Sequence, residues 1–160
     1  MKRFYLPILA FLFLATLTPA FAIEQPRIVP RANEAPKPIN EVFSRLKSYF
    51  SDPNNHFELV SAEPSKHTIV AKQSGIGDLV WNNWAFCKTG PVEMIYKYVD
   101  GTVTVTVKLE KTTKHSTFVR VAADFEGAYR LGSNENKVAC QSKFALEDQI
   151  LSAAGASSAN

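Results

Sequence analysis

Residues 92–111 read VEMIYKYVDGTVTVTVKLEK, and the pair Asp100-Gly101 separates two runs in which polar residues alternate with apolar or aromatic ones. Alternation with a period of two is typical of β-strands, and an Asp-Gly pair between two such runs favours a type I′ turn. The stretch therefore predicts a β-hairpin that joins Val92–Val99 to Thr102–Lys111. The register of such a turn collects on one face the residues Met94, Tyr96, Tyr98, Val103, Val105 and Val107.

Other segments have the same strand-like features, because they are short, contain apolar residues and end at turn residues. We expect strands at His56–Glu63, His67–Gln73 and Leu79–Lys88. A further strand should follow the polar loop Thr112–Ser116. In that strand the residues expected to face inward are Val119, Val121, Ala123 and Phe125.

Helices are predicted on both sides of these strands. From Ile39 to Phe50 the apolar residues recur at steps of three and four, which gives a helix one apolar face. A second helix, about Lys143 to Ala154, has its stripe at Leu146, Ile150 and Ala153 and should end at Gly155. The predicted fold class is α+β: an antiparallel meander sheet of about six strands, with an N-terminal and a C-terminal helix packed on it.

The first residues have the order of a bacterial-type signal peptide. Lys2 and Arg3 precede an apolar run, Phe4 to Leu17, and the small residues of Ala20-Phe21-Ala22 favour cleavage after Ala22. The run is about 14 residues, whereas a spanning helix needs roughly 20, so we expect no stable membrane insertion after cleavage. The expected location is the periplasm or the outside of the cell.

Three segments would then make up the mature chain. Residues 23–38 contain four prolines and are expected to be a leader, either a semi-rigid spacer or an arm that docks on a partner. Residues 39–155 are expected to form a single domain. Residues 156–160 are expected to be a disordered tail.

The sequence contains two cysteines, Cys87 and Cys140. In an oxidising compartment a pair of cysteines most often forms a disulfide, which is our prediction here; two free thiols are the alternative. The charge balance argues against nucleic-acid binding. Loss of Lys2 and Arg3 reduces the net charge from +3 to about +1, and a nearly neutral domain lacks the clustered positive charge that nucleic-acid binding needs.

No motif in the chain points to catalysis, a metal or a cofactor. His56, His67 and His115 lack the spacing of a metal site and are expected to be solvated loop residues. Asp124 and Glu126 share a strand face and could act as an acid–base pair, but a solvated outer face explains them as well. We therefore predict that the protein is not an enzyme, with no catalytic residues, no metal and no cofactor.

The candidate binding residues are aromatic. If Leu79–Lys88 is a strand, Trp81 and Cys87 face the core, and Trp84 and Phe86 must be covered by another part of the chain or by a partner. Tyr96 and Tyr98 complete the predicted set. The expected function is binding or accessory, with a protein partner in the cell envelope or outside the cell. The alternative is a carrier of a small apolar ligand, in a pocket lined by Tyr96, Tyr98, Trp81 or Trp84, and Phe125.

Overall fold

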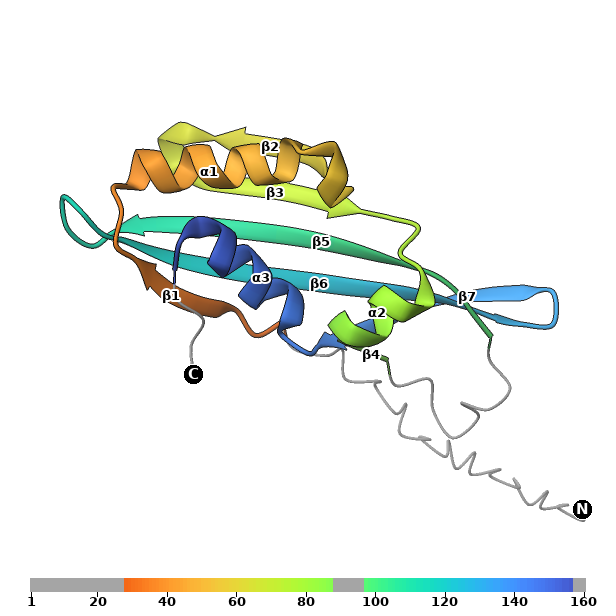
Figure 1. The fold of residues 1–160 in the computed structure, drawn as a ribbon. Coiled ribbons are helices and arrows are strands. Elements are labelled where there is room, and N and C mark those ends of the chain that lie inside the picture. The colour runs from red at the N-terminus through yellow and green to blue at the C-terminus, as the bar shows by residue number, and fades with distance from the viewer. Residues whose placement is uncertain (1–27, 88–96, 157–160) are drawn as a thin grey trace, which may run out of the picture.

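The structure, a computed structural model, describes residues 28–87 and 97–156. Within these residues a seven-stranded antiparallel sheet has one face covered by three helices (Figure 1). The helices are α1 (Ile39–Ser51), α2 (Asp78–Trp84) and α3 (Ala145–Ala154). The α+β class predicted from the sequence is confirmed, with helices packed on an antiparallel sheet and a disulfide between Cys87 and Cys140.

The strands are not all joined in chain order. They are β1 (Arg31–Ala35), β2 (Glu58–Glu63), β3 (Thr68–Gln73), β4 (Ala85–Phe86), β5 (Lys97–Lys111), β6 (Thr117–Leu131) and β7 (Asn134–Ser142). Their spatial order is β2-β3-β5-β6-β7-β4, and β1 pairs with β6 beside the start of that strand. The sheet therefore departs from a pure meander at β1 and β4.

The core lies between the helices and one face of the sheet. On β5 the buried residues are Val103, Val105, Val107 and Leu109, and on β6 they are Val119, Val121, Ala123 and Phe125. The helix α1 contributes Val42, Phe43, Leu46 and Phe50 to the same core. The alternation in the sequence thus predicted correctly which side chains of these two strands face inward.

The predicted hairpin at Asp100-Gly101 is wrong. The strand β5 continues through this pair, and Asp100 and Gly101 lie opposite Ala128 and Gly127 of β6. The register shifts between Tyr98 and Asp100, as in a β-bulge. Residues 92–96, the first part of the predicted strand Val92–Val99, lie outside the described residues.

The predicted strand at Leu79–Lys88 is also wrong over most of its length. Residues 78–84 form the helix α2, and only Ala85–Phe86 are extended, in β4. A short apolar run is ambiguous between the two structures, and here Asp78 occupies the first turn, where an acidic side chain stabilises a helix. The helix allows Trp81 to enter the core between α2 and β5.

Both ends of the predicted domain contain structure outside residues 39–155. The strand β1 comes from the segment assigned to the proline-rich leader, and its Ala35 is buried in the core. At the other end Gly155 has φ +81°, and the next residue, Ala156, is buried and donates its N–H to Leu151 O. The expected signal peptide lies outside the described residues, and no described helix is long and apolar enough to cross a membrane.

Candidate binding surface

Three large apolar side chains of α2 and β4 are exposed to solvent. Leu79 is 85% exposed, Phe86 49% and Val80 44%. Single exposed apolar residues are common on soluble proteins, whereas several from one short segment favour an interaction site. We call the surface formed by Leu79, Val80 and Phe86 the α2–β4 surface.

The opposite side of α2 is anchored in the core by Trp81, which is 1% exposed. Its ring stacks on Tyr98, with centroids 5.9 Å apart, and meets Phe125 edge-on at 5.6 Å. Aromatic pairs of this geometry stabilise a structure beyond the area that they bury. The helix therefore presents Leu79 to solvent while Trp81, two residues later, fixes it to the sheet.

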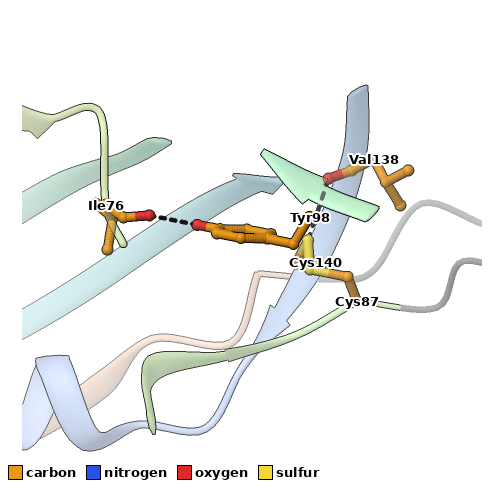
Figure 2. The surroundings of a disulfide bond; sticks show 5 residues. All are labelled: Ile76, Cys87, Tyr98, Val138 and Cys140. Carbon is orange, nitrogen blue, oxygen red and sulfur yellow. Dashed lines mark hydrogen bonds between the residues drawn. A yellow bond between two sulfur atoms is a disulfide. The ribbon is translucent and has the colours of Figure 1, made fainter. Parts of the chain in front are cut away.

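Tyr98 supports Trp81 from the sheet side. Its hydroxyl donates a hydrogen bond to the carbonyl oxygen of Ile76, in the loop before α2 (Figure 2). Its ring also meets that of Tyr129 edge-on, with centroids 5.6 Å apart. Burial raises the pKa of the Tyr98 phenol well above its ordinary value, so the hydroxyl stays protonated and keeps its role as donor.

The disulfide ties the end of this segment to β7 (Figure 2). Ala85 and Phe86 of β4 pair with β7, and Cys87 follows them directly. Both sulfur atoms pack against the backbone of Gly127 in β6, where an added Cβ atom would lie 3.3 Å from each. The Tyr129 ring would lie closer still, at 2.8 Å, so a glycine at 127 leaves room for both this ring and the disulfide.

Lys143 fixes the C-terminal end of α2. Its backbone N–H donates to the carbonyl oxygen of Trp84 at 2.8 Å, and its ammonium group donates to the carbonyl oxygen of Asn82. A positive charge beside the last carbonyls of a helix interacts favourably with the helix dipole. The segment that forms the α2–β4 surface is therefore held to the rest of the domain by a disulfide and by hydrogen bonds from Lys143.

The five predicted binding residues have different surroundings. Trp81 is buried in the core, Trp84 and Tyr98 are partly buried against it, and Phe86 is exposed. Tyr96 lies outside the described residues. Leu79 and Val80 were not predicted, because the segment was expected to be a strand. Asp78 after Gly77 was the available signal for a helix start.

The histidines and paired carboxylates lie in ordinary structural positions. His56 and His67 each close a single 3₁₀ turn, with φ of 57° and 50°, and His115 is exposed in the loop between β5 and β6. Asp124 and Glu126 are exposed on the sheet face without helices, where Glu126 accepts a hydrogen bond from Lys137 at 2.8 Å. Among the described residues no cluster of three or more metal-ligating side chains occurs.

Comparison with known proteins gives two weak structural similarities. No protein-family model matches the chain, and a search of curated proteins found no match. A TBP-like protein from Parabacteroides distasonis has a TM-score of 0.37 at 8% identity, over 69% of this chain and 64% of that one. A DUF4468 family protein from Bacteroides ovatus has a TM-score of 0.37 at 13% identity, over 71% and 64%. The chain thus spans less than two thirds of the length of either protein.

Proposed function

We propose that this chain is an exported, non-enzymatic binding or accessory module that engages another protein of the cell envelope through the α2–β4 surface. The observation that carries the proposal is the exposure of Leu79 on a helix whose other side is fixed in the core. A side chain in this position contributes little to the stability of the fold. A partner that covers it gains the free energy of burying it.

The energetics favour such a surface as a docking site. Complete burial of a leucine or phenylalanine side chain is worth about 1.5–3 kcal/mol. Binding normally loses part of this gain to the ordering of mobile groups. Here the backbone of α2 and β4 is already held by Trp81, Lys143 and the disulfide, so less ordering remains to be done on binding.

The disulfide supports the export part of the proposal. Disulfides persist in oxidising compartments and are rare in reducing ones, and both described cysteines are engaged in one. The n-region, apolar run and small residues of Met1 to about Ala22 are the second support, from the sequence alone.

Within residues 28–87 and 97–156 no observation favours the alternative, a carrier of a small apolar ligand. Trp81, Tyr98 and Phe125 pack ring against ring on the inner face of the sheet. Because these rings contact one another, we do not extend the proposal to ligand transport.

Site-specific photo-crosslinking tests the proposal. A photoreactive amino acid is placed at Leu79 in the full chain, expressed in its native envelope, and a matched one at Val60 in β2, which is 56% exposed at the other edge of the sheet. We expect a discrete crosslinked protein from position 79 and not from position 60. The product should disappear when Val80 and Phe86 are both replaced by serine. The same products from both positions, or none from position 79, would show that the proposal is wrong.

A further inference from the structure

Glu147 occupies a core position in α3. The buried stripe of this helix consists of Leu146, Glu147, Ile150, Leu151 and Ala154. The glutamate is 0% exposed, as its apolar neighbours Leu146 and Ile150 are. An ionisable side chain in an apolar stripe breaks the pattern on which helix packing depends, and such departures are expected at sites with a function.

Both carboxyl oxygens of Glu147 are buried, and neither makes a hydrogen bond of good geometry with another described residue. An ionised carboxylate buried without a partner costs several kcal/mol, and such a group takes up a proton instead. Burial accordingly raises the pKa of Glu147, an effect opposed by the nearby Ser142 hydroxyl, by the backbone and by Arg31, and increased by Asp148.

The charged groups near Glu147 link α3 to β1. Arg31 of β1 donates to both carboxylate oxygens of Asp148, at 3.1 and 3.4 Å, and its guanidinium group lies 5.1 Å from the centre of the Phe144 ring. The other elements that contact α3 are α1, β6 and α2, and their buried residues include Leu46, Val121 and Trp81. The charged groups that act on the Glu147 carboxyl are Asp148 and Arg31. The first turn of α3 therefore contains the buried Glu147 carboxyl and, next to it, Asp148, which pairs with Arg31 of β1.

The strand β1 is weakly held compared with its neighbours. It pairs with β6 over five residues, from Arg31 to Ala35, whereas β5 pairs with β6 along its whole length. Within the described residues β6 is its one strand partner, so β1 forms an edge of the sheet at this point. Local opening of a short edge strand requires much less free energy than global unfolding.

We propose that Glu147 is a proton switch for β1: the neutral carboxyl keeps the first turn of α3 and the attached β1 packed on the sheet, and loss of the proton releases them. Because β1 belongs to the segment predicted to be the leader, the switch sets how firmly this segment is joined to the domain. Release is favoured as the pH rises.

The direction follows from proton linkage. In the opened state the Glu147 carboxyl has the ordinary pKa of a glutamate, near 4.5, and in the packed state its pKa is higher. The packed state therefore binds the proton more tightly. Opening is independent of pH below the ordinary pKa and becomes easier as the pH rises from there towards the raised pKa.

Amide hydrogen exchange of the full chain tests the switch. After division by the intrinsic exchange rate, the opening constant of β1 amides should rise with pH above about pH 4.5 and level off above the raised pKa of Glu147. The rise should be at most about tenfold per pH unit, since one proton is linked. In the uncharged variant Glu147→Gln it should be constant over the same range. The amides of β2, at the opposite edge of the sheet, are the internal control and should show no such slope.

Three results would overturn the proposal: a pH-independent opening of β1 in the original chain, the same slope in Glu147→Gln, or an equal slope in β1 and β2. A thermal melt of Glu147→Gln shows that the variant is folded. A second variant, Glu147→Leu, removes the charge with an apolar side chain and should likewise abolish the slope.

Discussion

The six-membered ring of the Trp81 indole occupies the place that a side chain at Gly101 would take. A Cβ atom added to Gly101 would lie 2.2 Å from Cε3 and 2.4 Å from Cζ3 of Trp81, closer than real Cβ atoms approach. Glycine in a strand often marks a close approach of another group to the backbone. Position 101 is therefore a glycine because Trp81 packs against the backbone there, which also secures α2.

Replacement of Gly101 by alanine should destabilise the protein. Either the Trp81 ring leaves its position between Tyr98 and Phe125, or β5 moves, and overpacking of this kind typically costs about 1–3 kcal/mol. Urea unfolding followed by tryptophan fluorescence measures the change in the free energy of unfolding.

The matched control is Gly77→Ala, before α2, where an added Cβ atom has nothing within 4 Å. Its effect should be clearly smaller than that of Gly101→Ala. Equal losses from the two substitutions would contradict the contact between Gly101 and Trp81 as the reason for a glycine at 101.

The error at Asp100-Gly101 shows what alternation can and cannot predict. Whether Val103 or Thr104 faces inward depends on the pleat of one strand, so a local pattern was sufficient. The partner of that strand depends on residues far along the chain, here β6. An Asp-Gly pair fits a type I′ turn, but it is equally compatible with the bulge beside Val99 and the contact with Trp81.

Substitutions in α2 should separate its buried side from the α2–β4 surface. Trp81→Ala removes a fully buried ring and should lower the free energy of unfolding by about 3–5 kcal/mol. Leu79→Ser changes an exposed side chain and should stay within about 0.5 kcal/mol. Denaturant unfolding of the two variants, measured side by side, checks the division. A large loss from Leu79→Ser would show that Leu79 is part of the core.

The same segment explains why the candidate site was only partly predictable. Trp81 and Cys87 were predicted to face the core, and both are buried. Trp81 and Ala85 are four residues apart, which is the spacing of one side of a helix, and Ala85 and Cys87 are two apart, which is the spacing of one side of a strand. A continuous strand would place the same three residues on one face, so the wrong element still gave the right buried residues. A helix exposes different residues of the same sequence from those that a strand exposes, so Leu79 was not identified as a surface residue. Glu147 was missed as well, because a stripe drawn through Leu146 and Ile150 does not show that the residue beside them is buried.

Removal of the disulfide should weaken the whole domain. The bridge joins residues separated by 53 positions, for which chain entropy corresponds to about 4 kcal/mol at most and typical measured losses are about 2–4 kcal/mol. The double variant Cys87→Ser, Cys140→Ser should therefore melt many degrees lower, as measured by calorimetry. The original chain in a thiol reductant is the control and should melt as the variant does. An unchanged melt, with two reactive thiols in the native chain, would contradict the bridge.

The last prediction concerns the dependence of global stability on pH. The pKa of Glu147 is raised in the folded chain, so its burial is harmless below about pH 4.5 and destabilising as the pH rises towards the raised value. Glu147→Gln should therefore raise the melting temperature near pH 7 and leave it almost unchanged near pH 4. Glu41→Gln is a control of opposite sign, because a hydrogen bond from Lys37 lowers the pKa of Glu41, so that its ionised form stabilises the fold above its ordinary pKa. That variant should gain nothing near pH 7. If Glu147→Gln instead lowers the melting temperature at neutral pH, the buried carboxylate is ionised and paired, and the proton switch is wrong with it.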